Sequence, residues 1–367
     1  YTINLIRSLS KIDSENSYYL LFYGKKRKNL GMKKIGIKRE NFVPIVLPFS
    51  LFSIPNQILL PLYLKKNEID IYYAPNYMVP LIKKPCAFVI TVHDIIPLKF
   101  PEFTPKSKKT RLFWLYKLIM KRIVKIADVI ISDSKKTKRD IIKYFYCSNK
   151  NICTVYPGID SDFFNINFRN KGKDFKKQYN ISDNLVLYVG RQDPYKNLLN
   201  LVKAFRKMVD EDCVRAKLII VGPEDERYPE VRLFIKQYNL TEKIIFSGYL
   251  SKSDLVSIYH QADLLILPSK YEGFGLPIIE AFACKTPVVA SNRASIPEVV
   301  GNAGILFNPE SVNEIRNAMK SILKDGELAQ SLVEKGQKRL DLFSWNKSGG
   351  EILGIFENVY EKKKEML

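Results

Sequence analysis

Short apolar runs alternate with longer helical stretches throughout this 367-residue sequence, and this alternation restricts the fold more than any other feature. The expected strands lie near 19–23, 70–73, 87–92, 129–132, 152–155, 185–190, 217–222, 244–247, 263–267, 287–290 and 304–307. The expected helices lie near 1–10, 55–66, 107–126, 134–147, 197–209, 229–238, 252–261, 277–284, 311–324, 327–341 and 346–364. Strands that alternate with helices form parallel sheets through right-handed crossovers. The sequence therefore predicts an α/β fold.

The length and the composition predict two folded domains. A chain of 367 residues is long for one hydrophobic core, and 46% hydrophobic residues are enough to build two. We expect an N-terminal domain at 1–165, a polar linker at 166–184, a second domain at 185–345 and a last helix at 346–367. Both domains should be doubly wound, Rossmann-like sheets that face each other across a cleft, with ligands at the carboxyl ends of the strands.

The segment 263–284 has the most specific pattern, which is an apolar strand, a glycine loop and a helix. Pro277 suits the first helical turn, and the loop before it points backbone N–H groups and the positive helix end at an anion. Glu272 precedes this loop, and Glu280 falls in or just after the first turn. The alternative is an ordinary turn with two unspecialised acids, but the order of acid, glycine loop, proline and acid favours a ligand site. The loop consists of Gly273, Phe274, Gly275 and Leu276.

Several motifs, in a fixed order, resemble those of one enzyme family. They are TVHDIIPLKFP at 91–101, VYPGID at 155–160, YVGRQDPYKNL at 188–198, LIIVGP at 218–223, IIFSGYL at 244–250, E-x7-E at 272–280, TPVVAS at 286–291 and IPEVVG at 296–301. Together they resemble the retaining GT-B glycosyltransferases of the family 4 type, which transfer a sugar from a nucleotide diphosphate-sugar. The first motif is similar to the mannosyltransferase-like branch in particular.

The resemblance implies an activity and its partners. We expect retaining, metal-independent transfer of a hexose to a saccharide or lipid-linked saccharide acceptor in polysaccharide or glycolipid synthesis, with GDP-mannose as the leading donor. The nucleotide-sugar is a substrate, so the resemblance implies no cofactor. A nucleotide-sugar epimerase or phosphorylase on the same scaffold stays open as an alternative, as does a non-catalytic basic adaptor for membranes or nucleic acid. No nucleic-acid-binding motif supports that adaptor.

Two basic residues follow the expected strand 185–190. Arg191 comes directly after Gly190, and Lys196 comes five residues after Arg191, which places two cations near the carboxyl edge of the sheet. Fixed cations stabilise the charge that grows on a diphosphate leaving group, whereas the alternative is a solvated loop with two ordinary bases. With the resemblance, we expect both to bind the donor diphosphate. The resemblance adds to the donor site Gly190, Gly222, Tyr249, the loop 273–276 and Glu280, the last as the ligand of the ribose diol.

His93 and Asp94 stand at the end of the apolar run 86–92. A core or capping histidine is the alternative, but the position at a carboxyl strand end favours a role in ligand binding. The resemblance implies that this segment contacts the transferred sugar and that Glu272 does so from the second domain. The expected catalytic residues are therefore Glu272, His93 and Asp94.

No metal site is expected. Asp160 and Asp162 match the DxD motif of metal-dependent transferases of another fold, but no apolar strand delivers both acids to a cleft. The sequence has two histidines, which are too few for a transition-metal cluster. Its five cysteines form no CxxC pair and leave an odd count, as expected for small buried residues in a reducing cytoplasm.

The two halves of the sequence differ in charge. Residues 1–170 hold 30 basic and 12 acidic residues, a net charge of +18, whereas residues 171–367 hold 29 and 26, a net charge of +3. A general lysine bias would load both halves, so we expect an anionic partner, which is membrane phosphate, a pyrophosphate-linked acceptor or nucleic acid. The helix 107–126 combines apolar and basic residues, and is either an ordinary core helix or one that lies against a bilayer. We expect a cytoplasmic protein, in peripheral contact with the inner face of the cell membrane.

The first residues read as a helix that is already under way at Tyr1, with Ile3, Leu5, Ile6 and Leu9 as its apolar stripe. In similar proteins this helix follows a first strand and a glycine-rich loop, and the resemblance also implies that the last helix, 346–367, returns to the N-terminal domain. We therefore expect that these 367 residues lack a strand from inside the first sheet. Such a loss would lower stability and activity, because it leaves backbone groups and apolar surface without partners.

Overall fold

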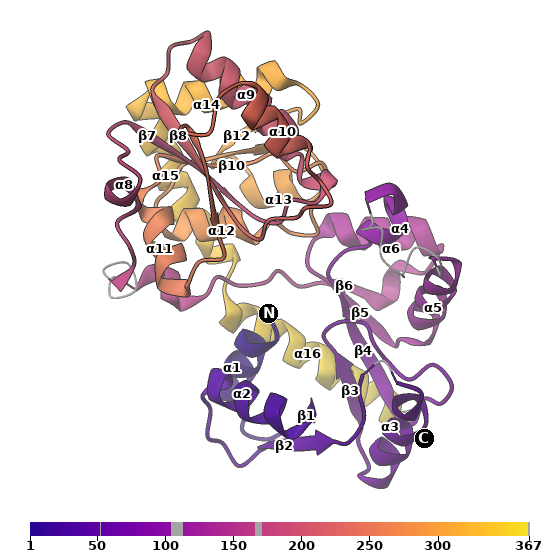
Figure 1. The fold of residues 1–367 in the computed structure, drawn as a ribbon. Helices are drawn as coiled ribbons and strands as arrows, with labels where there is room; N and C mark the ends of the chain where they lie inside the picture. Colours follow the sequence, from indigo (N-terminus) through magenta and orange to yellow (C-terminus); the bar gives the residue numbers. More distant parts are fainter. Residues whose placement is uncertain (52, 104–112, 166–170, 366–367) are drawn as a thin grey trace. The chain divides into compact units, whose positions relative to one another are not determined.

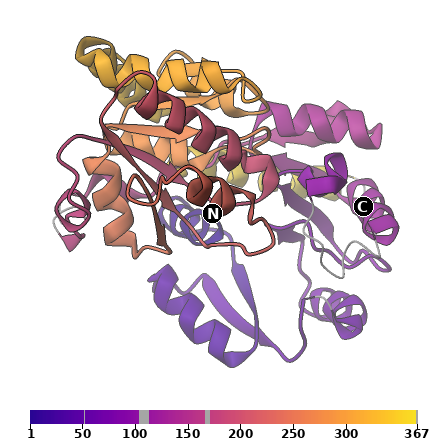
Figure 2. The same cartoon turned by 45° about the horizontal axis from the view of Figure 1, so that its top comes forward.

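The computed structural model describes residues 1–51, 53–103, 113–165 and 171–365, and the chain divides into two units. Unit 1 consists of Tyr1–Leu98, Lys106–Gly158 and Phe343–Leu367, and unit 2 consists of Lys99–Pro105 and Ile159–Leu342. In each unit, helices cover a parallel sheet (Figures 1 and 2). The predicted α/β fold class is confirmed.

Unit 1 contains two parallel sheets. The larger has the order β3(Ile71–Ala74), β4(Ala87–Val92), β5(Val129–Ser132), β6(Ile152–Thr154), and the smaller pairs β1(Tyr18–Tyr23) with β2(Phe42–Leu47). Every side chain of β4 is buried, as expected for a central strand covered on both faces. Phe88, Ile90 and Val92 join the hydrophobic core on one face of this sheet, and Ala87 and Val89 join the core on the other.

The helices of unit 1 are α1(Thr2–Ile12), α2(Lys25–Ile35), α3(Ile54–Lys66), α4(Ile96–Lys99), α5(Phe113–Ile126), α6(Lys135–Phe145) and α16(Trp345–Lys364). Helix α4 ends at Lys99, which is grouped with unit 2. The last helix, α16, packs along α1, where Ser8 Oγ donates to the Trp345 carbonyl at 2.7 Å. Gly349 allows this approach, because a Cβ there would lie 2.2 Å from Ser8 Oγ. The C-terminal helix is thus part of the first unit.

Unit 2 contains one parallel sheet of six strands in the order β12-β11-β10-β7-β8-β9. The strands are β7(Asn184–Val189), β8(Ala216–Val221), β9(Ile244–Gly248), β10(Leu264–Leu267), β11(Val288–Ser291) and β12(Ile305–Phe307). The chain runs outward from β7 through β8 to β9, then returns to the other side of β7 as β10. The winding therefore reverses between β7 and β10, and ligands bind at the carboxyl ends of strands at such a reversal.

The helices of unit 2 are α8(Phe175–Gln178), α9(Leu198–Asp210), α10(Glu230–Gln237), α11(Lys252–Gln261), α12(Leu276–Ala283), α13(Ile296–Val300), α14(Val312–Lys324) and α15(Gly326–Arg339). One large hydrophobic cluster joins α9, α10 and α14 to the sheet through residues such as Phe205, Ile235 and Met319. The amphipathic pattern that predicted these helices is the pattern that builds this core.

The division into units differs from the expected domain boundaries in several places, one of which is that residues 343–345 group with unit 1. Residues 99–105 and 159–165 group with unit 2, and so does the described part of the expected linker 166–184. Helix α8 in that linker buries Phe175, whose backbone N–H donates to Gln261 Oε1 of α11 at 2.7 Å. This packing attaches the segment to the second unit. The first residues of the expected linker, 166–170, lie outside the described residues.

The expected helix 107–126 is described from Phe113 onward. Residues 104–112 lie outside the described residues. They include four of the basic residues in and beside this helix, which are Lys106, Lys108, Lys109 and Arg111. Met120, Ile123 and Val124 of α5 are buried in the core of unit 1. Among the described residues, no helix combines the length and the apolar character that a bilayer span requires.

Candidate functional site

The loops after β7 and β10 meet at the reversal point of unit 2. Asn197 Nδ2, at the end of the first loop, donates to the Pro268 carbonyl at 3.1 Å, and the Lys270 N–H donates to the Tyr195 carbonyl at 2.8 Å. Asn197 has a positive φ of 62°, which short polar side chains tolerate better than most. The two loops are thus fastened together where the fold predicts a ligand.

Lys196 and Glu272 form an ion pair across these loops. Lys196 Nζ lies 2.7 Å from Glu272 Oε1 and 2.9 Å from Oε2, and Ser269 Oγ donates to Oε1 at 2.6 Å. The Glu272 residue is only 8% exposed. Burial makes each charge depend on its partner, because a charge with no counter-ion is costly away from water.

Arg191 stands at the rim of the same site. Its Nε lies 2.9 Å from Asp193 Oδ2, and its carbonyl accepts a hydrogen bond from the Tyr188 hydroxyl at 2.7 Å. The Asp193 residue is buried, whereas the Arg191 side chain is 58% exposed. Asp193 therefore fixes one edge of the guanidinium while much of the group faces solvent, where it is able to bind an anion.

A close approach of main chains at the ends of β7 and β8 requires Gly222. This residue has a φ of 139°, and a Cβ there would lie 2.0 Å from the Gly190 carbonyl oxygen. Its N–H donates to the Gly248 carbonyl at 3.0 Å, which places the exposed Tyr249 beside the end of β8. Glycine is the residue that accepts both this φ and this distance.

The loop 273–276 leads into α12. Gly275 has a φ of 103° directly before the helix, and Pro277 occupies the first turn, as predicted. Ser295 Oγ donates to the carbonyls of Glu272 at 2.9 Å and Phe274 at 3.1 Å. Phe274 is buried and Leu276 is exposed. The serine holds the loop so that the N-terminal amides of α12 stand at its mouth.

Glu280 lies one turn into α12 and faces α11. The Tyr259 hydroxyl donates to its Oε2 at 2.8 Å. Burial raises the pKa of Glu280 to about 7, and Asp160 also raises it, while the hydrogen bond from Tyr259 and the charge of Lys252 lower it. Glu280 is therefore a carboxyl group that titrates near neutral pH and has one oxygen engaged by tyrosine.

The two acids of the DxD sequence share one lysine. Lys252 Nζ lies 2.7 Å from Asp160 Oδ2 and also pairs with Asp162. In the described ranges of the chain, no group of three or more His, Cys, Asp or Glu side chains has an arrangement that would hold a metal ion.

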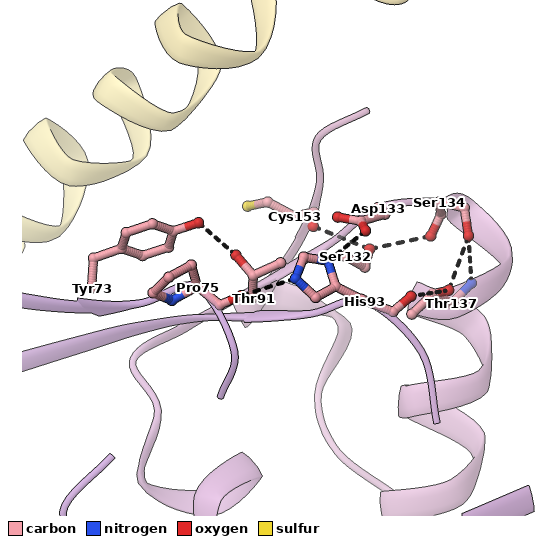
Figure 3. A network of polar contacts seen from close by, with 9 residues as sticks. All are labelled: Tyr73, Pro75, Thr91, His93, Ser132, Asp133, Ser134, Thr137 and Cys153. Atoms are coloured by element: carbon pink, nitrogen blue, oxygen red, sulfur yellow. Dashed lines mark hydrogen bonds and ion pairs between the residues drawn. The ribbon is translucent and has the colours of Figure 1, made fainter. Parts of the chain in front are cut away.

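Unit 1 presents its own polar cluster at the ends of β4 and β5 (Figure 3). His93 follows β4 and Asp133 follows β5, and the register of these strands pairs Val92 with Ser132. His93 Nδ1 lies 2.6 Å from Asp133 Oδ2, and His93 Nε2 lies 2.9 Å from the Pro75 carbonyl. The Tyr1 ring meets the imidazole edge-on at 4.9 Å between centroids.

Both ring nitrogens of His93 therefore face hydrogen-bond acceptors. An imidazole donates two hydrogen bonds only when it is protonated on both nitrogens. Burial lowers the pKa of His93, but the hydrogen bond and charge of Asp133, with the Pro75 carbonyl, raise it more, so the net shift is upward. The cluster favours an imidazolium at the end of β4.

Asp94 has a local contact in the structure. Its Oδ1 accepts a hydrogen bond from the Ile96 N–H at 2.9 Å, which stabilises the turn before α4. Thr137 Oγ1 in α6 donates a hydrogen bond to the His93 carbonyl at 3.4 Å and accepts one from Ser134 Oγ. Ser134 caps α6 by accepting from the Thr137 N–H, so the helix end and the His93 turn are joined.

Asp133 is the functional candidate that the sequence reasoning missed. The signal was present, because Ser132-Asp133-Ser134 follows one parallel strand as His93 follows its neighbour. Asp133 is buried, and among the described residues no donor reaches its Oδ1. The structure thus groups Arg191, Lys196 and Glu272 in unit 2, and His93 with Asp133 in unit 1.

Comparison with known proteins connects both units to one family. Residues 171–339 match the family described as Glycosyl transferases group 1, and residues 1–163 match Glycosyltransferase Family 4. The chain is 29% identical over 287 residues to O-antigen chain mannosyltransferase B of Escherichia coli, covering 78% of this chain and 74% of that protein. It is 28% identical over 267 residues to O-antigen chain mannosyltransferase RfbU of Salmonella typhimurium, covering 72% and 68%.

Other relatives are much longer than this chain. The serotype-specific mannosyltransferase WbdA of Escherichia coli is 26% identical over 290 residues, which cover 78% of this chain and 35% of WbdA. The chain thus spans about a third of the length of that relative.

Solved structures share the fold of the whole chain. A glycosyltransferase from Rickettsia africae has a TM-score of 0.74 at 18% identity, covering 98% of this chain and 93% of that one. Anabaena HepE, in complex with UDP and glucose, has a TM-score of 0.73 at 18% identity, covering 97% and 96%. With both halves matched in sequence and the whole chain matched in fold, this protein belongs to the group 1 and family 4 glycosyltransferases of GT-B architecture.

Proposed function

We propose that this protein transfers a hexose from a nucleotide diphosphate-sugar to a saccharide or lipid-linked saccharide acceptor, with retention of the anomeric configuration. The observation that carries the proposal is the meeting of Arg191, Lys196 and Glu272 with the N-terminus of α12 at the reversal point of the unit 2 sheet. Cations and helix N-terminal amides at such a point suit a diphosphate.

GDP-mannose is the proposed donor. The support is that several of the relatives are mannosyltransferases, two of which act on O-antigen chains by their names. A polysaccharide or glycolipid is accordingly the proposed product.

In the proposed mechanism, the cations of unit 2 stabilise the negative charge of the leaving group. Arg191 and Lys196 bind the diphosphate and stabilise the charge that grows on it as the glycosidic bond breaks. Glu272 orients Lys196 and contacts the sugar, and Glu280 binds the ribose diol. His93 and Asp94 contact the transferred sugar, and a phosphate oxygen of the leaving group takes the proton of the acceptor hydroxyl. Because Arg191 and Lys196 supply the positive charge, we propose that the reaction needs no metal ion.

The test is a panel of nucleotide-sugars, each assayed for thermal shift and for product. A ligand at about 100 times its Kd adds about 2.7 kcal/mol to the stability of the folded state, so the true donor raises Tm most. The product should be a glycoside with the anomeric configuration of the donor, formed equally well in EDTA. An isomerised nucleotide-sugar without glycoside would instead identify an epimerase, and a strict need for Mg²⁺ or Mn²⁺ would refute the metal-independent mechanism.

We also propose a cytoplasmic location with peripheral membrane contact. The five cysteines form no CxxC pair and leave an odd count, which suits a reducing compartment. The net charge of +18 in residues 1–170 suits an anionic surface.

A further inference from the structure

Helix α3 exposes apolar side chains where a surface helix normally carries polar ones. Ile54, Ile58 and Leu62 follow one another at intervals of four residues, so they form one stripe, and each is more than half exposed. The opposite side of α3 is also mostly apolar, with Leu60 and Leu64 buried in the core of unit 1. A helix that is apolar on both sides is expected to be covered on both.

Helix α5 and the turn at 81–84 extend this apolar face. Trp114 and Leu118, four residues apart on α5, are more than half exposed, and so is Ile82 in the turn. Side chains of both helices form hydrogen bonds with the backbone of the turn. The Leu81 N–H donates to Gln57 Oε1 of α3 at 2.7 Å, and Arg122 Nε of α5 donates to the Leu81 carbonyl at 3.4 Å. The turn therefore contacts both α3 and α5 in unit 1.

The same three segments carry positive charge only. Residues 54–66, 81–84 and 113–126 contain no acidic residue. Their eight cations are Lys65, Lys66, Lys83, Lys84, Lys117, Lys121, Arg122 and Lys125. Lys84 pairs with the nearby Asp128 at 2.5 Å, whereas no acid stands within the segments to neutralise the others. Exposed aliphatic and indole groups among lysines match the boundary between lipid headgroups and acyl chains.

We propose that the exposed side chains of α3, of residues 81–84 and of α5, here named the α3–α5 surface, dock onto an anionic lipid bilayer. The apolar side chains enter the headgroup boundary, and the cations contact lipid phosphates. This inference deepens the proposed peripheral contact and rests on it, by naming the surface and its partner. A nucleic acid would satisfy the lysines but would leave Ile54, Ile58 and Leu62 in water, so a bilayer fits the whole surface better.

The experiment measures co-sedimentation of the full 367-residue chain with vesicles of phosphatidylcholine alone or with 30 mol% phosphatidylglycerol. We expect binding to the anionic vesicles at low salt, and weaker binding at 0.5 M salt, because mobile ions screen exposed charges. The triple variant Ile54→Ser, Ile58→Ser, Leu62→Ser should bind at least about tenfold less, since burial of each large apolar side chain favours binding. These side chains are exposed, so the variant should fold normally, which circular dichroism and Tm will check.

Two matched controls distinguish binding through this surface from non-specific hydrophobic adsorption and from non-specific electrostatic attraction. The variant Leu30→Ser, Leu233→Ser, Leu342→Ser removes three exposed leucines that lie elsewhere, and it should bind like the parent. Neutralising Lys117, Lys121 and Arg122 on α5 to Gln should weaken binding more than neutralising Lys25, Lys26 and Lys33 on α2, which is the more basic of the two helices. Equal losses within either matched pair would overturn the proposal.

Tryptophan fluorescence gives a second reading. The chain has two tryptophans, Trp114 and Trp345. On anionic vesicles the emission should shift to the blue and be quenched by lipids brominated near the headgroup, and Trp114→Phe should abolish both effects. No binding at low salt, equal binding to neutral vesicles, or tighter binding to RNA than to vesicles would refute the bilayer. Transfer to a water-soluble acceptor should be unchanged in the serine variant, so a failure of catalysis is distinguishable from a failure of docking.

Discussion

At the scale of single residues, the two cations of the unit 2 site stand in different surroundings. Lys196 pairs with the buried Glu272, whereas Arg191 is mostly exposed and needs only Asp193 to orient it. From the sequence, both residues were predicted to play the same role, which is to bind the diphosphate of the donor. The structure indicates that Lys196 also neutralises a buried carboxylate, so loss of the two side chains should have different effects.

Arg191→Ala should lower kcat by about 100-fold and leave Tm almost unchanged, because the side chain serves the ligand and not the core. Arg215→Ala is the matched control, since Arg215 is an exposed arginine paired with Asp183 before the amino ends of β7 and β8. Steady-state kinetics and thermal unfolding of both variants check this. Activity of Arg191→Ala within a fewfold of the parent would remove the assignment to the diphosphate.

Lys196→Ala should reduce activity and also destabilise unit 2, by about 3 kcal/mol, because it leaves Glu272 buried without its counter-ion. The double variant Lys196→Ala, Glu272→Ala should recover much of that stability but none of the activity. A double-mutant cycle from urea unfolding measures the coupling. Additive losses in the cycle would mean that the ion pair contributes nothing to folding.

The pair of His93 and Asp133 predicts a dependence of stability on pH. The folded-state pKa of His93 is raised, so its contribution to stability is complete below the unfolded pKa of about 6.5 and is lost as pH rises through the folded value. Asp133→Asn keeps a hydrogen-bond acceptor but removes the charge. It should lower the titration midpoint of His93, measured by NMR, and should cost more stability at pH 6 than at pH 9. An unchanged midpoint would show that Asp133 does not control the proton.

At the scale of the elements, the ends of β7 and β8 depend on one glycine. Gly222→Ala should destabilise unit 2 by on the order of 2 kcal/mol, because a side chain there is strained and meets the Gly190 carbonyl. Gly326→Ala is the control in the same unit, since nothing lies within 4 Å of a Cβ at that position, which begins α15. Urea unfolding should find Gly326→Ala close to the parent, and equal losses in both variants would refute the steric argument.

Several elements of unit 1, among them β2, α2 and the short α4, were not predicted from the sequence, and for β2 and α2 the physical reason is clear. Pro44 interrupts the run that forms β2, and proline is tolerated there because β2 pairs with β1 on one side only among the described strands. Helix α2 has the sequence KKRKNLGMKKI, with Ile35 as its one buried residue, so it lacks the apolar stripe on which helix prediction depends.

At the scale of the whole chain, unit 1 is assembled from segments that are distant in sequence. Its last segment, Phe343–Leu367, supplies α16, which packs on α1 and buries Ile352. Ile352→Ala should therefore cost unit 1 about 3 kcal/mol, while the exposed Tyr360→Ala should cost much less. Hydrogen exchange should quicken in β4 and stay unchanged in β10. Faster exchange in β10 as well would show that the two units unfold together.

The sequence by itself determined the local chemistry of this protein. Apolar runs predicted the strands β4 and β10. The order of acid, glycine loop, proline and acid at 272–280 predicted the turn into α12. Both predictions succeeded because strands and turns of this kind depend on residues that are neighbours in the sequence. Most strands were located within a residue or two for the same reason.

Only the tertiary structure decided which of these residues meet. The order of strands brought Lys196 to Glu272, and the register of β4 with β5 brought His93 to Asp133, at separations of 76 and 40 residues. Packing directed Glu280 toward Tyr259 and left the apolar stripe of α3 in solvent. Local patterns encode which face of an element is apolar, but contacts between distant segments follow from strand order and packing, which short-range patterns do not contain.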